Sequence, residues 1–191
     1  MTNLVHIPGQ GNLSIAPNAD APLLVVFGGI DVHKVHSGVY MWNYMNPIRQ
    51  RFHIFVAQTN SVNGTLAYDA LCKAVTAKGL KPSERILYLF SGGYRPGIDL
   101  LTTSGASVFS SICLVDIWMG GARVGNFYKG LADHNAAKIT YVYTTFGANN
   151  KVARDYIAKK VVPRATLVQS LANEGGMDTH MRTNVIAVNT L

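Results

Sequence analysis

The chain has 191 residues, of which 48% are hydrophobic and 14% charged, and its formal net charge is +7. A chain of this length buries about 70% of its unfolded surface, so one domain over residues 1–191 needs no disulfide or metal to fold. This composition excludes a disordered chain, and no apolar run approaches the roughly 20 residues of a membrane span. Because the first residues lack the basic and apolar parts of a secretory signal, we expect a cytoplasmic protein without a membrane partner.

The excess of basic residues does not form a recognisable binding motif. Its densest groups, around residues 78–81 and 154–164, fall on expected helices or their flanks, and no aromatic residues interleave with them. We therefore interpret them as solvated faces and expect no nucleic-acid partner. The two cysteines, Cys72 and Cys113, make no CxxC or metal-ligand spacing. We expect both to be reduced, and we expect no metal and no cofactor.

Short apolar runs alternate with longer amphipathic stretches along the chain. In chain order the pattern predicts strands at 23–27, 53–57, 86–90, 112–117, 139–145 and 165–170, with helices at 39–51, 65–78 and 150–162 and a last helix near the C-terminus. Pro47 should kink or interrupt the first helix. The strands are almost continuously apolar, which is typical of strands covered on both faces. The fold class is therefore α/β: a three-layer α/β/α sandwich with a mostly parallel sheet of about six strands.

A serine follows the strand at 86–90 directly, in the order Ser91, Gly92, Gly93. A nucleophilic serine on a sharp strand-to-helix turn needs very small neighbours, because the backbone there is strained and crowded. An ordinary glycine turn or a phosphate-binding loop would use the same residues. No G-x-x-x-x-G-K-[ST] and no G-x-G-x-x-G occurs in the chain, which makes a nucleotide site the weaker interpretation.

A second glycine-rich turn, Gly28, Gly29 and Ile30, ends the strand at 23–27. Its free N–H groups, together with that of Gly92, could stabilise an oxyanion, at about 3–4 kcal/mol per donor. A plain glycine turn is the alternative interpretation.

An acid and a base are available after later strands. The sequence predicts a loop around His180, before the last helix. A histidine in this loop could reach Ser91 and act as its base. His33 and His36 are rivals near the glycine turn. Asp116 lies within the apolar strand at 112–117, so its carboxylate must be paired or stand at the strand's end where a site begins. Its partner would be the histidine ring, or a nearby cap or salt bridge.

The order Ser91, Asp116, His180 resembles that of the α/β-hydrolases, from about residue 23 to the C-terminus. More narrowly, the run from Phe90 to Arg95 is similar to the H-S-G-G-Y stretch of a group of small, poorly characterised bacterial α/β-hydrolase-like proteins. Leu89 stands where the usual first glycine of G-x-S-x-G would be, and Phe90 replaces the usual histidine.

The resemblance implies a minimal α/β-hydrolase fold without a lid domain. It implies Ser91 as nucleophile, His180 as base and Asp116 as the residue that orients the base. The implied oxyanion donors are the N–H groups of Gly92, Gly29 and Ile30. Four aromatic residues could line a pocket or equally pack in the core: Tyr94, Tyr40, Trp42 and Trp118.

Two functions remain open from the sequence. The first is a serine hydrolase of the esterase or amidase type, acting on a small or surface-presented substrate. The second is a catalytically inactive α/β-hydrolase-like module that binds a ligand or a protein, which the unusual Leu89 and Phe90 favour. The sequence does not indicate the oligomeric state.

Overall fold

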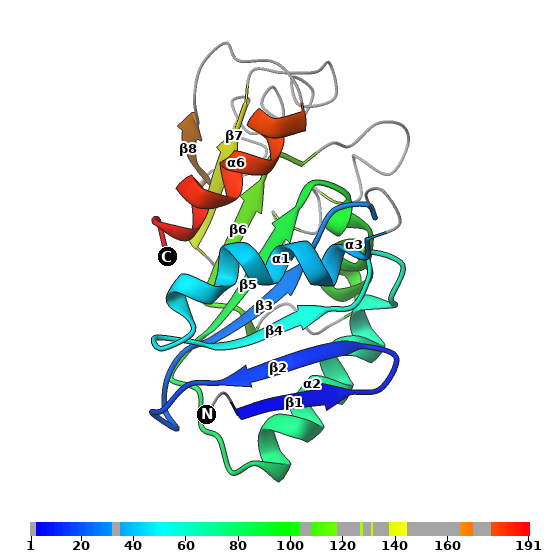
Figure 1. Cartoon of the computed structure of the whole chain (residues 1–191), viewed down its shortest axis with the longest axis vertical. Helices are drawn as coiled ribbons and strands as arrows, with labels where there is room; N and C mark the ends of the chain where they lie inside the picture. Colours follow the sequence, from blue (N-terminus) through cyan, green and yellow to red (C-terminus); the bar gives the residue numbers. More distant parts are fainter. Residues whose placement is uncertain are drawn as a thin grey trace.

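The computed structural model of the chain describes residues 3–31, 35–103, 108–117, 127, 131, 138–144, 165–169 and 177–191. Its centre is one eight-stranded sheet in the order β1-β2-β4-β3-β5-β6-β7-β8 (Figure 1). The strands are β1 (Asn3–Ile7), β2 (Gly11–Ile15), β3 (Leu23–Phe27), β4 (His53–Ala57), β5 (Arg85–Phe90), β6 (Ser111–Val115), β7 (Lys138–Tyr143) and β8 (Ala165–Gln169).

Six of these strands are parallel, and only the N-terminal hairpin runs the other way. β1 pairs with β2 and β2 with β4 in antiparallel fashion, whereas β4, β3, β5, β6, β7 and β8 pair in parallel. The carboxyl ends of β4, β3, β5 and β6 therefore meet at one edge of the sheet, which is the edge where α/β folds place their sites.

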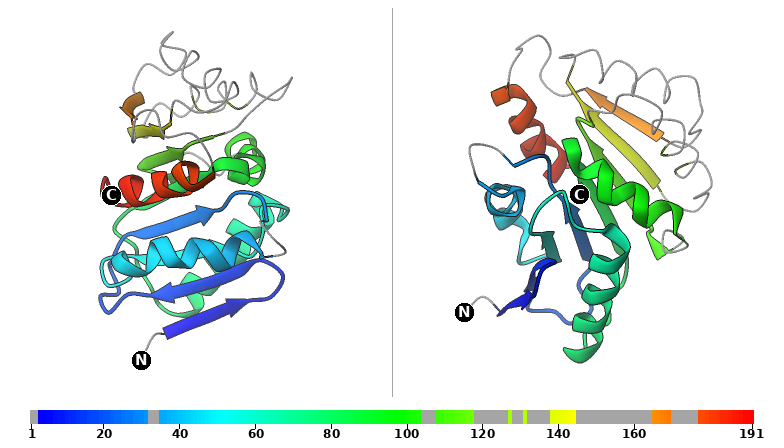
Figure 2. Two further views of the ribbon diagram at one scale, coloured as in Figure 1. Left: turned by 45° about the horizontal axis from the view of Figure 1, so that its top comes forward. Right: turned by 90° about the vertical axis from the view of Figure 1, so that its right-hand side faces the viewer.

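Helices cover both faces of the sheet and complete three layers (Figure 2). On one face lie α1 (Ser37–Met45), followed by the short 3₁₀ helix η1 (Asn46–Ile48), and α6 (Met177–Val188). On the other lie α2 (Gly64–Ala77) and α3 (Tyr94–Thr102), the latter entered through the 3₁₀ turn η2 (Ser91–Gly93). The Asn63 side chain caps α2 by accepting a hydrogen bond from the Leu66 N–H at 3.0 Å.

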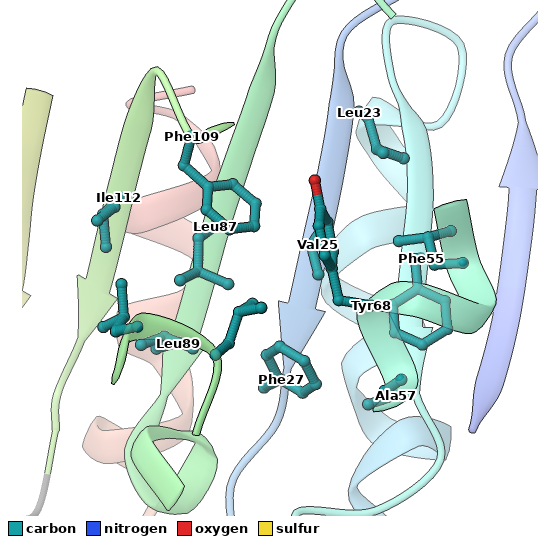
Figure 3. Packing of buried hydrophobic residues seen from close by; sticks show 14 of the residues in the cluster. Leu23, Val25, Phe27, Phe55, Ala57, Tyr68, Leu87, Leu89, Phe109 and Ile112 are labelled. Carbon is teal, nitrogen blue, oxygen red and sulfur yellow. The ribbon is translucent and has the colours of Figure 1, made fainter. Parts of the chain in front are cut away.

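The strands divide their side chains between two cores. Leu87 and Leu89 of β5 point into the core under α2 and α3, where they pack with residues such as Phe27 (Figure 3). Tyr88 and Phe90 point into the opposite core, under α1 and α6. This alternation follows from the two-residue period of a strand, and both faces are apolar because helices cover both.

The α/β class and the mostly parallel sheet predicted from the sequence are confirmed. All six predicted strands exist, two with unchanged bounds and four whose bounds differ by one or two residues at one or both ends. The sheet has eight strands, because the hairpin β1–β2 adds two to the six predicted. This hairpin lacks a strong pattern because β1 is an edge strand with an exposed Leu4.

The predicted helices at 39–51 and 65–78 correspond to α1 with η1 and to α2. α1 ends at Met45 and the 3₁₀ turn contains Pro47, as expected of a residue that cannot donate to the preceding turn. The predicted helix at 150–162 lies outside the described residues.

Cys72 is half-buried and Cys113 buried, and both are free thiols. Burial raises the pKa of Cys113 to about 12, so this thiol stays protonated and unreactive at neutral pH. No helix in the described ranges combines the length and apolar character that crossing a bilayer requires.

His53, at the start of β4, should be a structural residue that stabilises the sheet. Its ring is buried, Nδ1 accepts from the Ala16 N–H at 3.1 Å, and Nε2 lies 3.1 Å from the Ala19 carbonyl. His53→Ala would leave both backbone groups unpaired beside a cavity, and we expect it to lower the free energy of unfolding by about 2–4 kcal/mol in urea denaturation. The matched change at exposed His6 should cost less than about 0.5 kcal/mol. Equal effects would contradict this role.

Candidate active site

Ser91 occupies a strained turn at the carboxyl end of β5. Its backbone has a φ of 50°, and Asp116 with 42° is the only other non-glycine residue in the described ranges with a positive φ. Such backbone angles are unfavourable for residues with a side chain and concentrate at functional sites. The chain passes from strand to 3₁₀ turn to helix at this point, which is the geometry that presents a serine hydroxyl at a sheet edge.

Gly93 makes this turn possible, because the turn packs directly on the end of β3. A Cβ at residue 93 would lie 2.2 Å from the Phe27 carbonyl oxygen and 2.9 Å from that of Gly28. Both are backbone atoms that cannot move aside, so only glycine fits.

Leu89 does not prevent the turn, although it stands in place of the usual first glycine. Its side chain is fully buried and occupies the space that Gly97 leaves open on α3. A Cβ at residue 97 would lie 2.6 Å from Leu89 Cδ1. The glycine that lets strand and helix approach is thus on the helix instead of the strand.

The glycine-rich turn after β3 lies against Ser91, as the sequence predicts. A Cβ on Gly29 would be 3.0 Å from the Ser91 Cβ, and one on Gly92 would be 3.3 Å from the Ile30 nitrogen. Tyr40 fixes this turn by donating a hydrogen bond to the Ile30 carbonyl at 3.0 Å. Burial, and then the nearby Asp31, raise the pKa of Tyr40 well above its ordinary value, so its hydroxyl remains a donor.

Asp116 and His180 form a buried hydrogen-bonded pair. β6 ends at Val115, so Asp116 is the first residue beyond the strand, and its side chain is completely buried. The His180 Nδ1 lies 2.5 Å from Asp116 Oδ2. Thr144, just after β7, donates to Asp116 Oδ1 from its backbone N–H and from its hydroxyl, each at 3.0 Å. This carboxylate is therefore fixed from two sides.

His180 lies in the first turn of α6, and its predicted position in a loop was wrong. The buried face of this helix begins with polar residues, among them Thr183 and Asn184, so the sequence there lacks the apolar stripe of a helix. The His180 ring stacks on Phe90, the residue before Ser91, with centroids 4.7 Å apart and planes at 28°. No hydrogen bond joins the Ser91 hydroxyl to this ring among the described residues.

The other sequence candidates lie apart from this cluster or outside the described residues. His36 bonds Asp31 at 2.9 Å, and His33 and Trp118 are not described. Tyr94 is half-buried at the edge of the core under α2 and α3. Trp42 lines a cavity of about 410 Å³ whose other lining residues are Leu4, Ser14, Asn43, Asn46 and Arg49.

The structure also adds residues that the sequence analysis missed. Thr144 could have been suspected as the first polar residue after a buried strand. Gly97 and Asn60, which lies in the loop after β4, give no local signal, since only the folded structure shows which residues lie next to them. Within the described ranges, no group of three or more His, Cys, Asp or Glu residues could hold a metal ion.

No family model and no curated protein matches this sequence. Solved structures do match it over nearly the whole chain. FphF, a fluorophosphonate-binding serine hydrolase of Staphylococcus aureus, is 13% identical with a TM-score of 0.62, covering 99% of this chain and 98% of that chain. Est1E from Butyrivibrio proteoclasticus is 14% identical with a TM-score of 0.60, covering 99% and 96%. The esterase RhEst1 from Rhodococcus sp. ECU1013 is 10% identical with a TM-score of 0.60, covering 98% and 95%.

These likenesses show that the chain has the α/β-hydrolase fold, as the resemblance in the sequence implies. The narrower resemblance to small bacterial proteins stays a prediction.

Leu89 and Gly97 should be coupled in stability. Gly97→Ala would normally favour a helix by about 1 kcal/mol, but here we expect it to destabilise by about 1–3 kcal/mol because of the clash. Leu89→Ala should cost about 2–5 kcal/mol. In chemical denaturation the double variant should lose at least about 1 kcal/mol less than the sum of both single variants. Simple additivity would contradict the pairing.

Tyr88 should anchor the helix that carries His180. Its hydroxyl donates to Asn184 Oδ1 at 2.7 Å, both residues are fully buried, and burial raises the Tyr88 pKa well above its ordinary value. Tyr88→Phe would orphan the amide oxygen, and we expect a loss of about 1–3 kcal/mol in unfolding free energy. Tyr94→Phe is the control, since the Tyr94 hydroxyl has no hydrogen bond among the described residues, and it should change stability by less than about 0.5 kcal/mol.

Proposed function

We propose that this chain is a serine hydrolase that cleaves an ester or amide through Ser91, His180 and Asp116. The observation that carries the proposal is the buried His180–Asp116 pair stacked on Phe90, next to a serine with a left-handed backbone. The serine hydrolases and esterases among the matched structures support the same reaction class.

The hydrogen bond to Asp116 prepares His180 for proton transfer. Because a carboxylate only accepts, Nδ1 of the ring is the donor, and the neutral ring then carries its lone pair on Nε2. In the proposed reaction the Ser91 Oγ attacks the carbonyl carbon while its proton passes to Nε2. The imidazolium returns that proton to the departing alcohol or amine, and water releases the acyl group by the same sequence of steps.

The N–H groups of Gly92 and Ile30 are the proposed oxyanion donors. They belong to two turns that pack on each other beside Ser91, and Tyr40 fixes the second turn through the Ile30 carbonyl. Donors held in place before the reaction stabilise the developing charge without reorganising.

The second candidate function, a binding module without catalysis, is favoured by one observation. Ser91 and His180 make no hydrogen bond to each other among the described residues. In enzymes without substrate such bonds are often long and tighten when substrate binds, so this geometry is also compatible with a hydrolase. Reactivity of Ser91 decides between the two functions.

The substrate proposed is a small or surface-presented ester or amide. The cytoplasmic location, the absence of a nucleic-acid partner and the lack of a cofactor remain predictions from the sequence.

Ser91→Ala should abolish hydrolysis of short p-nitrophenyl esters and labelling by a fluorophosphonate probe. Removing the nucleophile from a working triad lowers turnover by a factor of about 10³ or more. The control is Ser83→Ala, at an exposed serine just before the amino end of β5, the opposite end of the strand from Ser91, and it should label and turn over like the wild type. A folded wild-type protein that never labels would favour the binding module, and labelling that persists in Ser91→Ala would exclude Ser91 as nucleophile.

A further inference from the structure

Asn60 is a buried residue whose side-chain amide nitrogen lacks a hydrogen-bond partner among the described residues. It lies in the loop between β4 and α2 and is only 6% exposed. Its Oδ1 faces the Ser61 hydroxyl at 3.5 Å, whereas its Nδ2 has no partner among the described residues. A buried donor without a partner destabilises the folded state, so proteins rarely keep one.

The unpartnered Nδ2 points to the backbone next to Ser91. A Cβ built on Gly92 would lie 3.0 Å from this nitrogen and 3.3 Å from the Ile30 nitrogen. Residue 92 therefore lacks a side chain where the Asn60 amide approaches. The nitrogen atoms of Asn60 and Ile30 are close to the same point beside Gly92.

The topology of the sheet explains why these groups meet. Ile30, Asn60 and Ser91 follow β3, β4 and β5, which are neighbouring parallel strands in the order β4-β3-β5. The carboxyl ends of these strands lie at one edge of the sheet (Figure 1). The loops that follow them therefore meet at that edge.

We propose that Asn60 is a third oxyanion donor: its Nδ2–H hydrogen-bonds the substrate oxygen that gains negative charge when Ser91 attacks. This inference rests on the proposed hydrolase function and adds a side-chain donor to the two backbone donors. The negative charge on the oxygen forms as the carbonyl π bond opens, and Asn60 stabilises it without transferring a proton. The donor is unpartnered before the reaction because its partner is the substrate.

A purely structural role for the Asn60 amide predicts a different stability effect. A structural donor stabilises the fold, so its removal lowers the melting temperature. An amide reserved for substrate contributes nothing to the free protein, and replacing it with an apolar side chain of similar size leaves the melting temperature unchanged or raises it.

The test compares Asn60→Leu and Asn60→Asp with the wild type. The readouts are the rate of fluorophosphonate labelling of Ser91, kcat and KM on a short p-nitrophenyl ester, and the melting temperature. In labelling, the Ser91 Oγ bonds to phosphorus, fluoride leaves, and the hydroxyl proton passes to His180, so the phosphoryl oxygen occupies the oxyanion site.

We expect Asn60→Leu to label about 100-fold more slowly and to lose kcat rather than raise KM, with no drop in melting temperature. Asn60→Asp should be slower still, because its carboxylate would repel the oxyanion. Gln58→Leu, which removes an exposed amide from the same loop, is the matched control and should label at the wild-type rate.

The outcomes separate this inference from the function on which it rests. If the wild type labels and both Asn60 variants label equally fast, the third donor is refuted while the hydrolase stands. The same holds if Asn60→Leu lowers the melting temperature and labels normally per folded molecule. If the wild-type Ser91 does not label at all, the hydrolase itself fails, and the third donor fails with it.

Discussion

The close approach of the turn after β5 to the end of β3 determines the geometry of the whole candidate site. At Gly93 the backbone comes so near the Phe27 carbonyl that no side chain fits between them. This contact fixes the left-handed Ser91 and, because Phe27 leads directly into Gly28, it also brings the glycine turn beside the serine. One backbone contact thus positions the proposed nucleophile and one of its oxyanion donors together, which lowers the entropic cost of aligning them.

The rest of the site is fixed by polar groups that hold one another in place. Asp116, the second residue with positive φ, is bound by Thr144 beyond β7 and by His180 of α6. α6 is in turn tied to β5 through the Tyr88–Asn184 hydrogen bond. His180 is therefore carried by a helix that is hydrogen-bonded to β5, the strand that precedes Ser91. The position of His180 depends on secondary structure more than on loops.

The sequence predicts the features that depend on a local residue pattern. It does not predict those that depend on contacts between segments far apart in the chain. The strands 23–27 and 53–57 are recognisable because burial on both faces makes them continuously apolar, and Ser91 and Asp116 stand out as polar residues at the ends of such strands. The first turn of α6 is hidden because its buried face is polar. Leu89 suggested an unfavourable turn, because no local pattern in the sequence shows that Gly97 leaves space for the Leu89 side chain.

The distribution of unsatisfied groups also distinguishes this edge of the sheet from the rest of the described protein. Four side-chain atoms in the described residues are buried without a partner, and two belong to buried residues, Ser37 and Asn60. The Ser37 Oγ would be 3.3 Å from a Cβ on Gly28, and the Asn60 Nδ2 would be 3.0 Å from a Cβ on Gly92, which lies next to Ser91. The other two unpartnered atoms, Gln10 Oε1 and Arg85 Nε, belong to half-buried residues, whereas the buried side chains of His53 and Tyr88 are paired. Backbone strain and unpaired donors both lower stability, so selection for stability alone would remove them. Their presence together at one edge of the sheet is therefore typical of a site kept for binding or catalysis.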